Sequence, residues 1–307
     1  MRNFLLRLLC FAVTMAAVCT FAGFSIDRLK GAARGETARE LYINDSLKAD
    51  VIVLGSSRAL HHYDPVIMES ILKQSTYNCG EDKMGIIFNY GRFRIATRKR
   101  MPEVVVYDVE PDYDLLLDDK TSYISGLRPY TKYAFIRQLL VDVDPMERFK
   151  MLLVPYRYNN KLQQVAKDCV APDTYSNGYI PYVGEMTHCV AQDYPQDHYD
   201  TLKWKYIEQL ADDCKGKATL VFAISPQLSF HSDSVYAPLK RLCKERNIAL
   251  LNHFCDTTFT NNWKLFYNSN HLEKKGAELY SLTIAREIKN ILNNKIHNNT
   301  KDESRRR

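Results

Sequence analysis

Short apolar runs alternate along the chain with longer amphipathic stretches. Five short runs are predicted to be strands: 51–54, a short strand at the start of 75–85, 103–109, 218–224 and 248–252. The run in 103–109 is β-branched without alternation, which is typical of a fully buried strand. The stretches that follow repeat their apolar residues every three to four positions, which predicts helices. These are expected in 64–73, from the end of 75–85 to about 98, in 199–214, in 234–246 and in 274–292. Strands that alternate with helices indicate a parallel sheet covered on both faces. We therefore predict an α/β fold, a flavodoxin-like three-layer sandwich with a five-stranded parallel sheet.

The N-terminus carries an uncharged run in residues 8–24, preceded by Arg2 and Arg7. Its 17 residues lie at the short end of what crosses a bilayer. We predict an N-terminal membrane anchor in residues 1–25, with the rest exported to the periplasm or extracytoplasmic space. The alternative is a cleaved signal that leaves a secreted protein.

Two further segments interrupt the α/β pattern. Residues 112–198 are too long for a connection and rich in Tyr, Asp and Pro, so they predict an insertion that covers or shapes the strand ends. This insertion interrupts the main α/β domain, which we predict to span residues 49–292. Residues 26–48 are polar and predict a stalk or leading helix, and the polar residues 293–307 predict a disordered tail.

Composition narrows the functional classes. Hydrophobic residues are 46% and charged residues 25% of the 307, which is ordinary for a globular protein. The net charge of +6 is not gathered into a basic stripe with interleaved aromatics, which argues against nucleic acid. The 8 cysteines lack the spacing of a zinc site, and we expect neither metal nor organic cofactor. The 20 tyrosines either serve packing or form a surface that faces a sugar or a partner.

Polar residues follow the predicted strands at their carboxyl ends, where ligands bind in α/β proteins. Acyl transfer through serine needs a nucleophile, a base and donors for the oxyanion. Ser57 could be the nucleophile, and His271, just before the last helix, could be the base. The backbone N–H groups of Ser57 and Gly80 could bind the oxyanion. Three further strand-end residues are candidates for contacting substrate: Arg58, Asn78 and Asp108.

The stretch "VLGSSRALHH" resembles block I of the SGNH/GDSL hydrolases, in which Gly-Asp-Ser follows the first strand and the serine is the nucleophile. In this chain Ser57 takes the nucleophile's place and Ser56 that of the aspartate. The Gly-Ser-Ser-Arg form is similar to a subgroup of exported bacterial proteins, some of which modify polysaccharides or cell-wall polymers by acyl transfer.

Two more motifs extend the resemblance over about 49–110 and 215–292. "YNCGEDKMG" is similar to the second block, whose glycine lends an oxyanion N–H, and this maps to Gly80. "NSNHLEKKGAELYS" resembles the fifth block, in which an aspartate and, three residues later, a histidine precede a helix. His271 matches the base and Asn268 the aspartate.

The chain departs from the family pattern at two points. Asn268 can hold an imidazole through its carbonyl but cannot stabilise the imidazolium by charge; in serine proteases the equivalent change costs roughly 10⁴ in kcat. A Ser57–His271 dyad, or a carboxylate such as Asp256, are the alternatives. In place of the third-block asparagine the chain reads "YDVEPDYD", which puts Asp108 nearby.

The resemblance implies an exported serine hydrolase that cleaves esters, with O-acyl groups on carbohydrate as the expected substrate. Two alternatives remain open. One is an acyltransferase or accessory protein for surface-polymer O-acylation, working with a membrane-bound acyltransferase. The other is an inactive binding module on the same fold.

Overall fold

The computed structural model describes the chain except for residues 118–123, 160, 185, 187–197, 229–231 and 307. The chain divides into two compact units, each built from two segments. The N-terminal unit comprises Met1–Ser46 and Ser122–Thr174, and the sheet unit comprises Leu47–Thr121 and Tyr175–Arg307.

The sheet unit contains five parallel strands in the order β2-β1-β3-β4-β5. They are β1 (Val51–Gly55), β2 (Thr76–Asn78), β3 (Val104–Asp108), β4 (Thr219–Ile224) and β5 (Ala249–Asn252). The register pairs the start of β1 with the starts of β2 and β3, so their carboxyl ends lie together at one edge. This is the flavodoxin-like strand order, which places ligands outside the ends of β1 and β3. The predicted α/β fold and five-stranded parallel sheet are confirmed.

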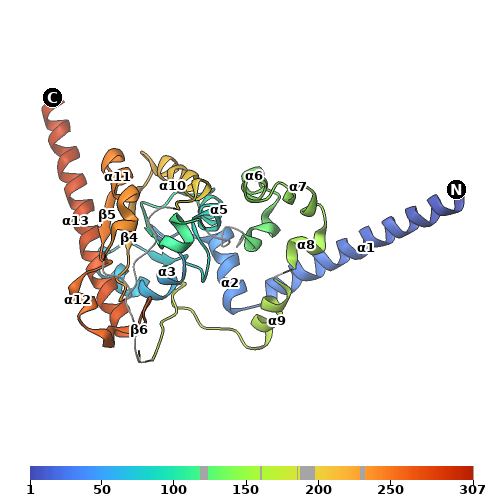
Figure 1. The fold of residues 1–307 in the computed structure, drawn as a ribbon, viewed down its shortest axis with the longest axis horizontal. Helices are drawn as coiled ribbons and strands as arrows, with labels where there is room; N and C mark the ends of the chain where they lie inside the picture. The colour runs from blue at the N-terminus through green and yellow to red at the C-terminus, as the bar shows by residue number, and fades with distance from the viewer. Residues whose placement is uncertain (118–123, 160, 185, 187–197, 229–231, 307) are drawn as a thin grey trace. The chain divides into compact units, whose positions relative to one another are not determined.

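Helices cover both faces of the sheet (Figure 1). One side carries α4 (Pro65–Leu72) and α13 (Lys274–Arg306), which pack against each other, and the other carries α5 (Ile86–Ala96), α10 (Thr201–Cys214) and α11 (Ala237–Arg246). The core on the first side joins alternate valines of β1 and β3 to Met68 of α4 and to Tyr280 and Ile284 of α13. Alternation arises because successive strand residues point to opposite faces.

Helix boundaries follow local chemistry. Asp64 caps α4 by accepting from the N–H groups of Val66 and Ile67, with Pro65 at the first helical position. Asp200 caps α10 in the same way. The last helix extends to Arg306, whereas the polar composition predicts a tail from 293; the disorder of that tail stays a prediction.

The N-terminal unit is helical. Its elements are α1 (Arg2–Ala32), α2 (Gly35–Leu41), η1 (Tyr42–Ser46), η4 (Ser125–Tyr130), α6 (Ala134–Val143), α7 (Glu147–Lys150), α8 (Val154–Tyr158) and α9 (Leu162–Val170). The middle of the predicted insertion thus packs with the N-terminal helices. Asp168 of α9 shows this, because it accepts hydrogen bonds from the backbone N–H and the hydroxyl of Thr37 in α2.

Among the described helices, α1 alone has the length and composition to cross a membrane. Its most apolar 18-residue window has a mean hydropathy of 2.1, and none of that window is buried. A signal anchor and a signal peptide both fit this helix.

Candidate active site

The nucleophile candidate lies at a tight turn between β1 and the short helix α3 (Ser57–His62). Gly55 ends β1 with φ +140°, and a Cβ there would lie 2.7 Å from the carbonyl oxygen of Asp108. A glycine is needed because other residues rarely adopt this φ and because β3 approaches so closely. The turn delivers Ser57 to the carboxyl edge of the sheet, at the first residue of α3.

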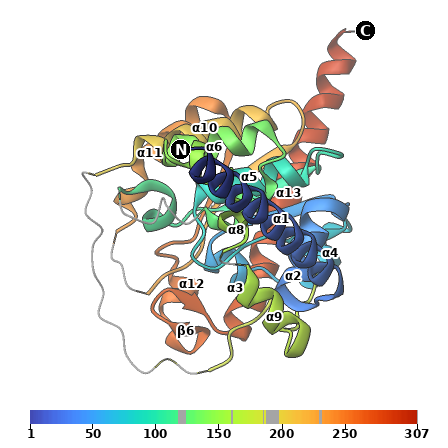
Figure 2. The same cartoon turned by 90° about the vertical axis from the view of Figure 1, so that its right-hand side faces the viewer.

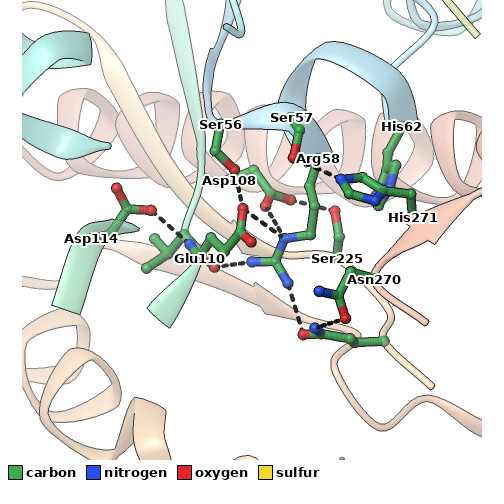
Figure 3. Close-up of polar contacts among 12 residues, drawn as sticks. Ser56, Ser57, Arg58, His62, Asp108, Glu110, Asp114, Ser225, Asn270 and His271 are labelled. Carbon is green, nitrogen blue, oxygen red and sulfur yellow. Dashed lines mark hydrogen bonds and ion pairs between the residues drawn. The ribbon is translucent and has the colours of Figure 1, made fainter. Parts of the chain in front are cut away.

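Ser57 faces the imidazole of His271 (Figure 3). The Oγ of Ser57 lies 2.7 Å from Nε2 of His271, although the two residues are 214 positions apart. His271 begins β7 (His271–Leu272), which pairs antiparallel with β6 (Phe266–Asn268). This small hairpin was not predicted from the sequence. It brings together the three residues of the predicted catalytic set.

Asn268 orients His271 through its side-chain oxygen. Its Oδ1 lies 3.0 Å from Nδ1 of His271 and accepts the backbone N–H groups of Asn270 and His271, each at 2.9 Å. An oxygen that faces Nδ1 requires a hydrogen on that nitrogen. Nε2 is then the lone-pair atom directed at Ser57, which is the tautomer that a general base needs.

His271 is a weak base in this setting. Burial lowers its pKa to about 4, and electrostatic interactions with His61 and Arg58 act in the same direction, while Asp82 opposes them. The hydrogen-bond partner of Nδ1 is an amide oxygen and not a carboxylate, so the effect of burial on the pKa outweighs the opposing charge of Asp82. The imidazole is therefore neutral and able to accept a proton from about pH 4 upward.

A sealed ionic cluster lies directly behind Ser57. The Arg58 Nε lies 3.2 Å from Asp108 Oδ1 and 3.8 Å from Glu110 Oε2, and the cluster also contains Ser56, which donates its hydroxyl to Glu110 (Figure 3). Burial raises the pKa of both carboxyls. Adjacent serines thus face different surroundings, since Ser56 bonds inward and Ser57 faces His271.

The burial of three side chains corrects the prediction that they contact substrate. Arg58, Asn78 and Asp108 all have 0% exposure, so they do not reach a ligand in this structure. Arg58 and Asp108 pair with each other. Asn78 donates to the carbonyl oxygens of Ala59 at 2.7 Å and Tyr63 at 2.9 Å, which secures the end of α3. The sequence could not show this, because the partners come from different elements.

Gly80 approaches the backbone of α3. A Cβ at this position would lie 2.5 Å from the Leu60 nitrogen, which accounts for the glycine. Its N–H donates to Oδ1 of Asn78 at 2.9 Å. An oxyanion role for Gly80 would require this hydrogen bond to be exchanged, and it stays a prediction.

Sequence reasoning missed an aromatic wall beside the dyad. Tyr182 stacks on Tyr267 with ring centroids 4.6 Å apart and on His61 with centroids 3.8 Å apart. It also meets the ring of His271 edge-on at 5.2 Å. We define the wall as His61, Tyr182 and Tyr267. The tyrosine-rich composition of 112–198 was the available signal, and it did not single out Tyr182.

A strap, residues 175–184, holds Tyr182 in the wall. Along it, the Asn177 carbonyl accepts from Asn78 N, the Ile180 carbonyl bonds Nδ1 of His61 at 2.7 Å, and the Tyr182 carbonyl accepts from Lys274 N. The strap thereby fastens the edge of β2, helix α3 and the start of α13 together. His61 is also held by Asp82, 3.0 Å from its Nε2.

His62 and Asp256 make structural hydrogen bonds that do not involve Ser57 or His271. His62 accepts the backbone N–H of Leu272 through Nε2 at 3.0 Å, so it fixes β7 against α3. Asp256, the alternative acid, bonds His253 at 2.8 Å instead of His271. That alternative is therefore wrong for this structure. Among the described residues, no group of three His, Cys, Asp or Glu side chains is placed to hold a metal ion.

No protein-family model and no curated protein matches the chain. Solved structures with a similar fold include the following three. A protein named for the G-D-S-L lipolytic family, from Desulfitobacterium hafniense, is 14% identical with a TM-score of 0.38, over 77% of this chain and 97% of that one. A protein named as an acylhydrolase, from Bacteroides fragilis, is 11% identical with a TM-score of 0.41, over 83% and 94%.

The third is a family two carbohydrate esterase from Clostridium thermocellum, solved with cellohexaose. It is 11% identical with a TM-score of 0.35, and the match covers 79% of this chain but only 64% of the esterase. These likenesses concern the fold alone, so the function of this chain has to be argued from its own residues.

Proposed function

We propose that this chain is an SGNH-type serine esterase, exported and held at the membrane by α1. The observation that carries the proposal is the row Ser57–His271–Asn268, with 2.7 Å and 3.0 Å between successive polar atoms. A nucleophile, a base and a group that orients the base are the minimum arrangement for acyl transfer through serine. Their order along the chain also follows the family blocks.

In the first step, Nε2 of His271 takes the proton of Ser57 as Oγ attacks the ester carbonyl. The Ser57 N–H is the first donor available to the oxyanion. His271 then returns the proton to the departing alcohol, which leaves Ser57 acylated. Water, deprotonated by the same imidazole, releases the acid and restores the serine.

The aromatic wall supports a carbohydrate ester as the substrate. Tyr267 is 38% exposed and stacks on Tyr182, so a flat apolar face with polar edges lies next to the dyad. The C–H face of a pyranose ring packs on such a surface, while its hydroxyls remain free for hydrogen bonds. The O-acyl group would then project toward Ser57.

An acyltransferase would use the same acyl-enzyme and differ only in its acceptor. The aromatic wall favours this second function if it binds an acceptor sugar, because a sugar hydroxyl would then take the place of the attacking water. Comparing product formation with and without added oligosaccharide separates them. A membrane-bound acyltransferase would be the partner in that case.

The decisive test is labelling with a fluorophosphonate probe. Wild type and Ser56→Ala should label and hydrolyse an aryl ester, whereas Ser57→Ala should lose both, with a rate loss of about 10³-fold or more. Ser56→Ala is a matched control because it removes the same hydroxyl one residue away. A wild-type chain that is folded yet does not label would identify an inactive binding module.

A further inference from the structure

The N-terminal unit exposes a set of large apolar side chains next to α1. Met146, Phe149, Leu152 and Leu153 are 54%, 60%, 74% and 62% exposed. We call these four residues the apolar ridge. The spacing of three residues puts Met146, Phe149 and Leu152 on one side of successive turns. Exposed apolar groups that cluster in this way mark a surface that another partner covers.

The contacts between α8 and α1 locate this ridge along the apolar helix. A Cβ at Gly23 would lie 3.0 Å from Cγ1 of Val154, the first residue of α8. Four residues later, the Tyr158 hydroxyl donates to Asp27 Oδ1 at 3.2 Å, and Lys30 Nζ lies 4.8 Å from the centre of its ring. The two helices therefore run in the same direction, with α8 beside the C-terminal part of α1 (Figures 1 and 2).

This direction fixes the level of the ridge. Leu153 is the N-cap residue of α8 and Leu152 directly precedes it, so both lie close to the level of Gly23, which packs on Val154. Gly23 is one residue from the end of the uncharged run 8–24. If α1 spans a bilayer, this level is the boundary between acyl chains and headgroups, where apolar side chains of a peripheral segment enter the lipid.

Basic side chains border the same surface. Arg137 and Arg148 line a cavity of about 530 Å³ between α6 and the α7 region, together with Ala134, Val141, Met151 and Leu152. Both arginines are exposed. The remaining lining residues, Thr131 and Gln138, are polar and uncharged. A partly apolar cavity with two guanidinium groups is complementary to an anionic phospholipid, because each basic residue near such a surface contributes about 1 kcal/mol.

We infer that the apolar ridge docks the N-terminal unit onto the surface of the anionic bilayer that α1 crosses. Leu152 and Leu153 enter the headgroup boundary, and Arg137 and Arg148 meet lipid phosphates. The inference rests on the membrane anchoring that is part of the proposed function. If the inference is correct, α1 and the apolar ridge bind the membrane together, and α1 is not the sole membrane contact of the N-terminal unit.

Quenching of tryptophan by brominated lipids tests the docking. The full-length chain is reconstituted in phosphatidylglycerol-rich bilayers as three variants: Leu152→Trp, Val170→Trp and Phe11→Trp. Leu152 and Val170 are matched, since both are exposed apolar residues of this unit at 74% and 87%. We expect the added fluorescence of Leu152→Trp and Phe11→Trp to be quenched at least about twofold and that of Val170→Trp to match the parent.

The three positions separate the inference from the anchoring on which it rests. Quenching of Phe11→Trp without quenching of Leu152→Trp overturns the docking and leaves the anchor intact. Quenching of neither overturns the anchoring. A ridge that another copy covers would show as Leu152→Trp shielded from lipid in an oligomer, which also overturns the inference.

The lipid charge is tested in the Leu152→Trp background. Adding Arg148→Glu should shift the docking equilibrium by about fivefold or more in phosphatidylglycerol bilayers, which corresponds to about 1 kcal/mol for the lost basic residue, with repulsion of the new carboxylate adding to it. In phosphatidylcholine bilayers the same change should have little effect. Equal quenching with and without Arg148→Glu in the anionic bilayer overturns the phosphate contact.

Discussion

Two histidines of the sheet unit differ in what faces their rings. His253 is held between Asp256 at 2.8 Å and Glu287 at 2.9 Å, and these partners raise its pKa despite burial. His271 faces the amide oxygen of Asn268, and burial lowers its pKa to about 4. Both rings are partly buried, so the carboxylates account for the opposite shifts. The chemistry of the partner, carboxylate or amide, therefore sets the direction in which the pKa of each ring moves.

The contrast also has opposite consequences for stability. A raised folded-state pKa stabilises the fold below the unfolded pKa of about 6.5, and that contribution is lost as pH rises through the folded value. The contribution of His271 to the free energy of unfolding has the opposite sign. Its lowered pKa makes the unfolded chain the better proton acceptor as pH falls from about 6.5 toward 4.

The largest effect should come from removing each imidazole in turn. We expect His271→Gln to reduce ester hydrolysis about 10³-fold or more, because Ser57 then has no base. His253→Gln should leave kcat/KM within about twofold, since His253 does not touch the dyad. Initial rates on an aryl ester measure both. Equal losses in the two variants would contradict the assignment of His271.

Making His271 resemble His253 should raise activity. Asn268→Asp places a charge beside Nδ1, which favours the imidazolium formed as Ser57 loses its proton. We expect a gain of about tenfold and an acid limb of the pH–rate profile that moves above pH 4. An unchanged rate together with an unmoved acid limb would refute the orienting role of Asn268.

The burial of His271 can be tested through the wall. Tyr182→Ala removes the ring that meets His271 edge-on, so water should reach the imidazole and its pKa should rise. Tyr267→Ala is the matched control, because Tyr267 belongs to the same wall and its ring stacks on Tyr182 and not on His271 in the part of the chain that the structure describes. NMR titration of His271 should show the shift in the first variant alone. In the second we expect KM for an acylated sugar to increase about threefold with kcat kept.

The smallest effect concerns stability. His253→Gln should lower the free energy of unfolding by about 1 kcal/mol near pH 5, discounted because Asp256 and Glu287 are partly exposed. The difference should fade as pH rises through the folded pKa of His253. Urea unfolding at a series of pH values measures it, and a constant difference across the series would exclude the ionic pairing.

The sequence predicted the sheet well because its central strands β1 and β3 are apolar, β-branched runs that are buried along their whole length. The site was predicted as far as motifs reached, namely Ser57, Asn268 and His271. The β6–β7 hairpin escaped notice because it has only three and two residues in its strands. Tyr182 escaped because no spacing rule connects it with residues more than 80 positions away.

Burial was the hardest property to infer. Arg58, next to the nucleophile, looked like a substrate contact, yet its partners come from the end of β3 and from Gln227 after β4. Only the three-dimensional register of β1 with β3 sets this pairing. A charged residue at a strand end can therefore serve either the ligand or the sheet, and its neighbours in space decide which.

The discontinuity of the N-terminal unit limits how this protein can be shortened. Its two segments are separated by β1 to β3, so deleting residues 1–46 would strip α1 and α2 from the helices in 122–174. Signal cleavage between 20 and 25 could likewise remove Gly23, against which Val154 packs. A stable catalytic fragment would also need 122–174 excised, with a new joint immediately before the strap that holds Tyr182. In this structure α1 therefore belongs to the packing of the N-terminal unit, and any shortened chain has to replace its contacts with α8 and α9.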